Sequence, residues 1–218
     1  MNRKIDHSRK TFAKTNIDTV RHRAEIMKNS FPNVKSIAEI CCGDCSGQYA
    51  AYMENFSLNS YCGLDIDPLI VKANLKGGID CIQGSALDSA VMKKFISFDI
   101  IFYGPPLSEN CDGHSILNFS QVEPGFFDFL NLMYNDLKYK GVVVCICPRT
   151  ADMGDITQLY NEIRKSDSSV SLPLIHYSYS NKTGNGEIHE LRLKYIELWF
   201  SNVHEDRWET VKSGLPSD

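Results

Sequence analysis

Two apolar runs, each followed by a short polar or small-residue segment, constrain the fold of this chain most strongly. The first run, Ile37–Ile40, leads into the turn Cys41–Gly47, and the second run, Tyr61–Leu64, ends at Asp65. A segment with helical spacing separates them, so the whole stretch has the layout of a βαβ unit. In such a unit the turn offers backbone amides and a helix N-terminus to a ligand, and an acid about 20 residues later can hold ribose hydroxyls. The two runs therefore predict a nucleotide-binding unit.

Further apolar or β-branched runs follow at regular intervals along the chain. Helical segments separate the first five runs, which predicts an α/β fold with a mainly parallel sheet covered by helices on both faces. The last two runs, 174–179 and 191–200, are joined by the polar, glycine-containing turn 181–186, which predicts an antiparallel hairpin. The predicted strands are 34–41, 60–65, 79–83, 98–103 and 141–147, and the predicted helices are 18–30, 46–56, 68–76, 87–95, 123–139 and 153–166.

Length and composition are those of a soluble protein with one well-packed domain. The chain has 218 residues, of which 43% are hydrophobic and 23% charged. No apolar run approaches the roughly 20 residues of a membrane span, and the polar start lacks the apolar core of a signal peptide. The eight cysteines lie mostly in apolar runs without regular spacing. We therefore expect a reduced, cytoplasmic protein that does not contact membranes.

Charge is distributed unevenly along the chain. Residues 1–35 carry nine Lys and Arg against three Asp and Glu, whereas the remainder carries fourteen against twenty-four. The acidic body is a poor partner for a phosphate backbone. The basic residues at the start form either an arm that contacts nucleic acid or closes over a ligand, or a solvated tail. We divide the chain into a basic arm with a helix (1–33), a main domain (34–201) and a polar tail (202–218).

Four motifs in the main domain resemble those of class I S-adenosylmethionine-dependent methyltransferases. They are Glu39–Gly47, Gly63–Pro68, Gln83–Asp88 and Phe98–Leu107, and the resemblance covers about residues 34–201. In that family a seven-stranded sheet carries its last strand reversed. The resemblance thus implies a three-layer Rossmann-like fold, a mainly parallel seven-stranded sheet closed by the C-terminal antiparallel hairpin, and S-adenosylmethionine as cofactor.

The first two motifs contain side chains suited to that cofactor. A carboxylate at Glu39 can accept hydrogen bonds from an ammonium group, directly or through water, and Asp65 can bind both ribose hydroxyls. Gly43 lets the backbone approach the amino-acid part of the ligand, and Ser46 is placed to cap the following helix, whose N-terminus suits a carboxylate. The predicted cofactor-binding residues are Glu39, Cys41, Gly43, Ser46, Gly47, Asp65, Ile66, Ser85 and Ala86.

The first motif also departs from the family pattern. Cys41 and Cys45 stand where glycine is frequent, so a position that needs a positive φ would be strained. Cys41, Cys42 and Cys45 raise the alternative of a metal site, but no His or fourth Cys follows at ligand spacing, and we predict no metal. The G-x-G-x-x-G fingerprint of nicotinamide-binding proteins is absent. A βα turn that binds no ligand remains an alternative.

The fourth motif indicates the type of chemistry. Gly104–Pro105–Pro106–Leu107 resembles the [ND]-P-P-[YFW] tetrad of amino methyltransferases that act on adenine, guanine or glutamine amides. Gly104 lacks the side-chain acceptor of that tetrad and Leu107 lacks its ring, but the Pro105 carbonyl remains and Tyr103 supplies an aromatic ring one step early. His114 follows in a polar loop, either as a group that orients a nucleophile or takes its proton, or as a solvated side chain. The predicted catalytic residues are Tyr103, Gly104, Pro105, Pro106 and His114.

The motifs together predict a methyltransferase that uses S-adenosylmethionine, with transfer to nitrogen favoured over transfer to oxygen. The acceptor is a small molecule, a protein or, through the basic arm, a nucleic-acid base; its identity and the oligomeric state are left open. Two alternatives come from other classes of protein. One is a catalytically silent S-adenosylmethionine-binding partner subunit, and the other is a nicotinamide-nucleotide oxidoreductase.

Overall fold

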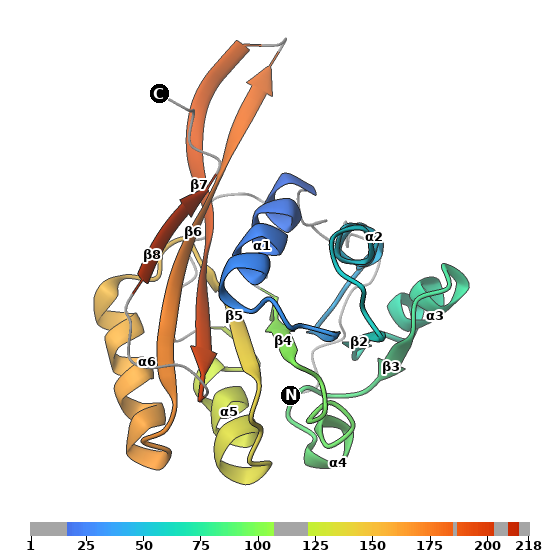
Figure 1. Cartoon of the computed structure of the whole chain (residues 1–218), viewed down its shortest axis with the longest axis vertical. Coiled ribbons are helices and arrows are strands. Elements are labelled where there is room, and N and C mark those ends of the chain that lie inside the picture. The colour runs from blue at the N-terminus through green and yellow to red at the C-terminus, as the bar shows by residue number, and fades with distance from the viewer. Residues whose placement is uncertain (1–16, 107–121, 185–186, 203–208, 214–218) are drawn as a thin grey trace, which may run out of the picture.

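The computed structural model describes residues 17–106, 122–184, 187–202 and 209–213. Its centre is one eight-stranded sheet with the order β3-β2-β1-β4-β5-β7-β6-β8 (Figure 1). The first five strands are parallel to one another, β7 runs antiparallel to both β5 and β6, and β8 is parallel to β6. The strands are β1 (Ser36–Ile40), β2 (Ser60–Asp65), β3 (Cys81–Gln83), β4 (Ile100–Tyr103), β5 (Val142–Pro148), β6 (Ser171–Gly184), β7 (Glu187–Ser201) and β8 (Glu209–Ser213).

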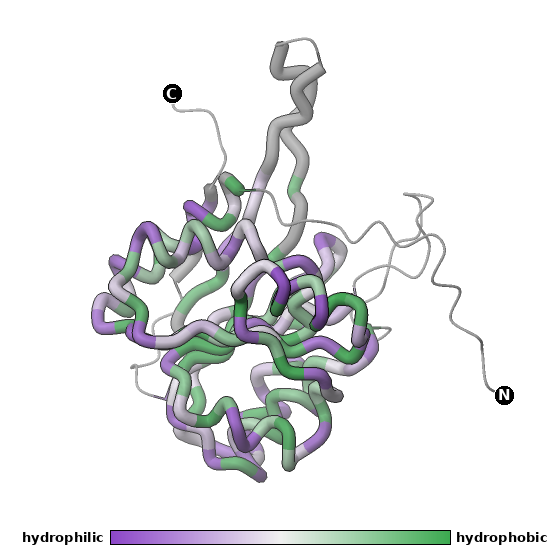
Figure 2. Tube along the Cα trace, turned by 90° about the vertical axis from the view of Figure 1, so that its right-hand side faces the viewer, coloured by the Kyte–Doolittle hydropathy of each residue, from purple (hydrophilic) through white to green (hydrophobic). Residues whose placement is uncertain are grey.

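Helices cover both faces of the sheet, which gives three layers. Residues of α1, α2 and α3 pack in one apolar cluster, and residues of α5, η3 and α6 pack in a second cluster on the opposite face. Figure 2 shows hydrophobic residues following the central strands, with hydrophilic residues distributed along the outer helices. The helices are α1 (Ile17–Ser30), α2 (Ser46–Asn55), α3 (Pro68–Lys76), α4 (Ser89–Met92), α5 (Phe126–Leu130), the π-helix η3 (Asn131–Asp136) and α6 (Met153–Ser166).

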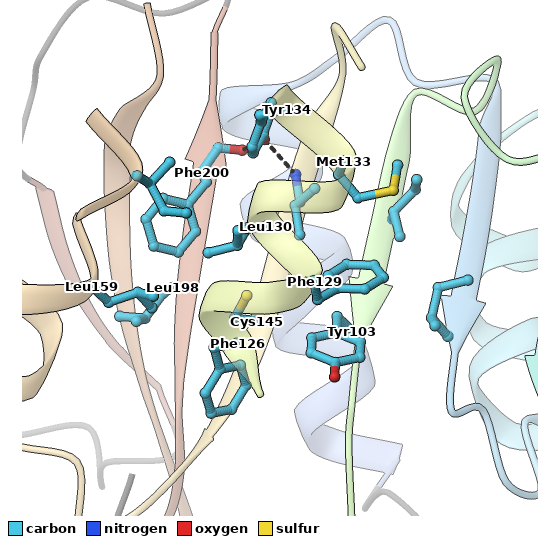
Figure 3. Packing of buried hydrophobic residues seen from close by; sticks show 14 of the residues in the cluster. Tyr103, Phe126, Phe129, Leu130, Met133, Tyr134, Cys145, Leu159, Leu198 and Phe200 are labelled. Atoms are coloured by element: carbon cyan, nitrogen blue, oxygen red, sulfur yellow. Dashed lines mark hydrogen bonds between the residues drawn. The ribbon is translucent and has the colours of Figure 1, made fainter. Parts of the chain in front are cut away.

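The central strands are buried on both faces, which explains their continuous apolar runs. In β1, Ala38 and Ile40 belong to the cluster under α5 and α6, whereas Ile37 belongs to the cluster under α1 and α2. Figure 3 shows the first of these clusters. In this cluster the Tyr134 hydroxyl accepts from the Val143 amide at 3.2 Å and donates to the Phe200 carbonyl at 2.9 Å. Two layers of side chains therefore hold the parallel strands in place, and this rigid arrangement fixes the turns at their carboxyl ends.

Local signals account for several helix starts. Asp67 caps α3 by accepting from the Leu69 amide, and Pro68 occupies the first turn of that helix. Asp152 and Asp155 form a reciprocal capping box at the start of α6. No helix in the ranges that the structure describes has the length and apolar character needed to cross a membrane.

The mainly parallel sheet with a C-terminal antiparallel pair confirms the predicted fold, with three differences. An eighth strand, β8, lies within the segment expected to be a polar tail. The β6–β7 pairing continues to Gly184 and Glu187, well beyond the last pairing of β7 with β5. The helix expected over 123–139 begins at Phe126 and continues as a π-helix. The basic residues 1–15, Leu107 and His114 lie outside the described residues.

Candidate functional site

The turn after β1 and the end of β2 meet at the carboxyl edge of the sheet. In this turn Cys41 has φ 59° and Gly43 has φ 54°, so both occupy the left-handed region. The Gly43 amide donates to Asp65 Oδ2 at 3.0 Å, and the Asp67 amide donates to Asp65 Oδ1 at 2.9 Å. Because an ionised carboxylate oxygen accepts more than one hydrogen bond, both oxygens can also accept from a ligand. The backbone thus fixes the orientation of a carboxylate that suits a diol.

The backbone of this turn is not covered by neighbouring side chains at its two glycines. A Cβ atom added to Gly43 or Gly47 would have no heavy atom of the described chain within 4 Å, apart from its chain neighbours and, at Gly47, the backbone of its own helix. Ser46 is the first residue of α2, and Cys45 occupies the N-cap position without a side-chain hydrogen bond that caps the helix. The prediction that Ser46 caps the helix is therefore wrong, because the helix starts at Ser46 itself. The turn nevertheless presents an open backbone, as a bound nucleotide requires.

Glu39 is a buried carboxyl group next to the turn. Its side chain is 5% exposed, and Oε1 has no hydrogen-bond partner among the described residues. Burial raises the pKa of Glu39 to about 7; Arg23 opposes this shift and Glu197 adds to it. A buried carboxyl group with an unsatisfied oxygen is costly unless a partner is supplied. A cationic ligand would provide such a partner.

A buried charged network lies beside Glu39 on the same face of the sheet. Arg23 of α1 donates through Nε to Glu197 of β7, and His176 Nδ1 lies 2.8 Å from the other Glu197 oxygen. All three side chains are at most 1% exposed. Burial raises the pKa of Glu197, but the nearby Arg23 and His176 outweigh it and hold that pKa below its ordinary value. The network fixes α1 against β7 and sets the electrostatic environment of Glu39.

This network was not predicted from the sequence. Its only signal is the presence of charged or polar side chains inside apolar runs, such as Glu197 within Ile196–Phe200 and His176 within 174–179. Such residues rarely lie fully buried unless they are paired. That signal does not indicate which residues pair with one another.

Exposed apolar side chains surround the Asp65 end of the site. Ile66 is 72% exposed directly after Asp65, and Leu87 is 40% exposed in the loop after β3. Ser85 Oγ accepts from the Leu87 amide at 3.2 Å, which shapes that loop, and Ala86 is buried in the core. Ile66 and Leu87 are thus available to contact a flat, apolar ligand group, whereas Ala86 supports the loop from below.

The Pro-Pro turn follows β4 at the same edge of the sheet. The Gly104 amide donates to the Ile40 carbonyl at 3.1 Å, so Gly104 lies next to the end of β1. Pro105 is buried and Pro106 is exposed. A Cβ added to Gly104 would lie 3.2 Å from Ile146 Cδ1, so a side chain there would require Ile146 to shift. The turn presents its backbone to the site.

Tyr103 lies in the core (Figure 3). Its ring is fully buried and stacks on Phe129 with a centroid distance of 3.8 Å, and its hydroxyl donates to the Pro124 carbonyl at 2.6 Å. Burial is the main cause that raises the pKa of this hydroxyl. Tyr103 therefore supports the segment before α5 and does not present a ring face to the site, which corrects the expectation that it replaces the aromatic of the tetrad.

No group of three or more His, Cys, Asp or Glu side chains is arranged to hold a metal ion within the part of the chain that the structure describes. The cysteines of that part are all free thiols. The structure thus brings Glu39, Cys41, Gly43 and Asp65 together with Gly104 at one sheet edge, while His114 lies outside the described residues.

No family model matches this chain, and no curated protein matches it. Many solved structures share its fold, among them the following three. The methyltransferase domain of bacterial CtHen1 is 12% identical with a TM-score of 0.55, over 85% of this chain and 100% of that one. The plantazolicin methyltransferase BpumL, solved with S-adenosylhomocysteine, is 11% identical with a TM-score of 0.50, over 84% and 82%. Spermidine synthase from Thermotoga maritima is 16% identical with a TM-score of 0.50, over 85% and 60%. These similarities show the fold alone, a Rossmann-like fold that is found in methyltransferases and in a spermidine synthase.

Proposed function

We propose that this protein is an S-adenosylmethionine-dependent methyltransferase. The observation that carries the proposal is the pair of acids at the sheet edge. Asp65 is oriented by the amides of Gly43 and Asp67, and Glu39 is a buried acid with an unsatisfied oxygen. A nucleoside with a ribose diol and an ammonium group matches both acids at once. The similarity to the fold of methyltransferases, one of them solved with S-adenosylhomocysteine, supports the same cofactor.

The chain offers complementary contacts for each part of this cofactor. Asp65 accepts hydrogen bonds from the ribose hydroxyls, and Glu39 balances the charge of the ammonium group. The open backbone at Gly43 and Gly47 admits the amino-acid part, and Ile66 contacts the adenine. Cys41 shapes the turn, Ser46 begins the helix behind it, and Ser85 and Ala86 shape the loop beside the adenine. When bound, the cofactor supplies a methyl group on a sulfonium centre.

We further propose transfer to an amino nitrogen at the Pro-Pro turn. The Pro105 carbonyl accepts a hydrogen bond from the acceptor amine, and the rigid turn at Gly104 and Pro106 aligns its lone pair for an in-line displacement. Tyr103 holds the Pro124 segment in place from below. The proton that the methylated nitrogen loses passes to His114 or to solvent. The acidic body favours a small molecule or a protein as acceptor, while the basic residues 1–15 keep a nucleic-acid base as an alternative.

Free thiols in the described residues are in keeping with a reducing compartment, and we propose a cytoplasmic location. Fractionation of cells that express a tagged chain tests this location directly.

Calorimetric titration with S-adenosylmethionine tests the proposed function. We expect saturable binding by the wild-type protein and a loss of affinity of about tenfold or more in Asp65→Ala, because the ribose loses its acceptor. Asp80→Ala is the matched control. Asp80 is exposed and directly precedes β3, so it lies at the amino end of that strand, whereas the site lies at the carboxyl ends of the strands. Absence of binding by the wild-type protein, or undiminished binding by Asp65→Ala, would refute the proposal.

One observation favours a second candidate, a silent S-adenosylmethionine-binding subunit. Gly104 has no side-chain acceptor, and Ile146 limits the space for one. Methyl-labelled S-adenosylmethionine separates the two candidates when it is added to cell extract with the wild-type protein. An enzyme acting on nitrogen transfers label into a base-stable product, whereas a silent subunit binds the cofactor and transfers none.

A further inference from the structure

Two thiols meet beneath the nucleotide turn. Cys42 follows Cys41 in the turn, Cys81 begins β3, and their sulfur atoms lie 3.8 Å apart. Gly63 of β2 makes this contact possible, because a Cβ at that position would lie 2.8 Å from Cys42 Sγ and 3.2 Å from Cys81 Sγ. A residue other than glycine would force the two sulfur atoms away. The packing therefore places the thiols face to face across the middle strand.

Asn74 of α3 connects the thiols to the proposed ribose site. Its Nδ2 donates to the Gly43 carbonyl at 2.8 Å and lies 3.6 Å from Cys42 Sγ and 3.8 Å from Cys81 Sγ. The Gly43 amide in turn donates to Asp65. A change in the position of either sulfur atom is thereby transmitted to Gly43 through a single buried side chain.

The environment of Cys81 differs from that of most other described thiols. The hydrogen bond from Cys42 is the main cause that lowers the pKa of Cys81, and Asn74 contributes in the same direction. Burial raises the pKa of Cys41 and Cys62 to about 12 and also raises that of Cys145. Because the thiolate is the reactive form, Cys81 is better suited than these three to react with an oxidant. Cys42 and Cys81 are 7% and 8% exposed, so the oxidant must be a small molecule.

We propose that Cys42 and Cys81 form a reversible disulfide when the protein meets a peroxide, and that this disulfide weakens binding at the neighbouring nucleotide turn. The Cys81 thiolate attacks one peroxide oxygen, the O–O bond breaks, and the products are the Cys81 sulfenic acid and hydroxide, which takes up a proton to become water. Cys42 then attacks the sulfenic sulfur, the S–O bond breaks, and a second water leaves. In total, two thiols and one hydrogen peroxide give one disulfide and two water molecules.

The geometry explains why the turn responds. A disulfide has an S–S distance of about 2.05 Å, so the two sulfur atoms must approach by roughly 1.8 Å from their separation in the reduced protein. This movement draws Cys42 toward β3 and disturbs the contact between Asn74 and Gly43. The amide that orients Asp65 moves with Gly43. The effect on ligand binding rests on the proposed function, whereas formation of the disulfide does not.

Peptide mapping of the full chain tests the disulfide itself. The reduced protein is treated with a small excess of hydrogen peroxide, remaining thiols are alkylated, and the digest is analysed by mass spectrometry without reduction. We expect a linked pair of peptides containing Cys42 and Cys81, which disappears after dithiothreitol. Cys45 is the critical competitor, because it lies beside Cys42 as well. A Cys42–Cys45 link, any other pairing, or no link at all would overturn the proposal.

Cofactor titration of defined redox states tests the consequence. Oxidised wild-type protein should bind S-adenosylmethionine at least fivefold more weakly than reduced protein, and dithiothreitol should restore the affinity. Cys81→Ala should bind equally with and without peroxide, while the matched control Cys145→Ala, which removes a buried thiol of β5, should stay sensitive. Sensitivity of Cys81→Ala equal to that of wild type contradicts the proposal. If reduced wild-type protein binds no cofactor, the proposed function fails, and peptide mapping, which needs no variant, still decides the disulfide.

Discussion

Glu39 combines a cost in stability with a proposed role in binding. Its pKa is raised from 4.5 to about 7, mainly by burial. Between these two values the folded protein holds a proton that the unfolded chain has released. The free energy of unfolding therefore falls as the pH rises through this window, and the stabilising contribution that is present below about pH 4.5 is lost above about pH 7. Sites that bind ligands often retain such unfavourable groups.

Glu39→Gln should separate the two roles. Because the neutral amide has no charge to bury, we expect the free energy of unfolding at about pH 8 to rise by about 1–3 kcal/mol, and its decline between about pH 5 and 7 to disappear. Affinity for S-adenosylmethionine should fall, since the ammonium group loses its counter-charge. Urea unfolding across this pH range and calorimetry measure the two effects. Glu54→Gln, at an exposed acid of α2, is the control. If the free energy of unfolding depends on pH in the same way in Glu39→Gln and in wild type, burial of a charge at Glu39 is not the cause of that pH dependence.

Cys41 shows a second residue-scale cost, because its φ of 59° belongs to the region that glycine tolerates best. Comparing Cys41→Gly with Cys41→Ala isolates this effect, since both remove the sulfur and only alanine keeps a Cβ. We expect the glycine variant to be more stable than the alanine variant by about 0.5–1 kcal/mol in urea unfolding. As a control, Ala73→Gly in the middle of α3 should lower the free energy of unfolding by about 1 kcal/mol, because glycine at a helical position is less favourable than alanine. A Cys41→Ala variant as stable as Cys41→Gly would show that the turn relaxes without strain.

At the scale of elements, local signals determined how well the sequence predicted each one. The strands β2 and β5 and the helices α3 and α6 lie within a residue of their predicted bounds, because apolar runs end there or caps such as Asp67 and Asp152 begin a helix. The strand β8 was missed because Glu209–Ser213 is a short, mostly polar segment that pairs only at the sheet edge. An edge strand needs no apolar run, so periodicity does not reveal it.

The candidate site likewise contains some residues that the sequence predicted and others that it did not. Asp65 and Gly43 were predictable because strand ends and the turn between them are local features, and the parallel sheet brings them together. The pairing of Arg23 with Glu197 spans 174 residues, and no local pattern encodes it. The contact of Cys42 with Cys81 depends equally on the parallel order of β1, β2 and β3. Sequence reasoning therefore identified the ligand-facing turn, while the buried groups that surround it required the fold.

The helix α1 is held to β7 by a buried ion pair, and Arg23→Met tests its importance. Removal of Arg23 takes away the guanidinium partner of Glu197 and leaves this buried carboxylate with His176 on its other oxygen, so we expect a loss of about 3–5 kcal/mol in the free energy of unfolding. Because the lowered pKa of Glu197 contributes stability above its unfolded value, wild type should lose this contribution as the pH falls through the folded value. The double variant Arg23→Met, Glu197→Gln should recover part of the loss. Urea unfolding of the single and double variants gives the coupling energy between Arg23 and Glu197. Strictly additive losses would contradict a stabilising interaction between these two residues.

At the scale of the whole molecule, the candidate site depends on both ends of the described chain. The turn that faces the ligand comes from β1 and β2, but the charge environment of Glu39 comes from α1 and from the reversed strand β7. Because β7 also pairs with β5 beside β4, the Pro-Pro turn and the nucleotide turn are part of one sheet. Occupation of the site should therefore stabilise the entire fold.

Thermal unfolding with and without S-adenosylmethionine tests this linkage. A ligand at about 100 times its dissociation constant adds about 2.7 kcal/mol to the free energy of unfolding, provided that it binds only the folded protein. For a chain of this size, that corresponds to a rise in Tm of about 5–10 °C. We compare this rise at about pH 8 and at about pH 6. At about pH 6 Glu39 is largely protonated, while the ligand's amino group keeps its charge, so the same ligand concentration should raise the Tm by less than at about pH 8. In Glu39→Gln the rise should be small at both pH values, and in Asp65→Ala a tenfold loss of affinity should reduce it to about half of the wild-type rise. An equal rise at both pH values in wild type would mean that the Glu39 carboxylate does not contribute to binding, even if Asp65 does.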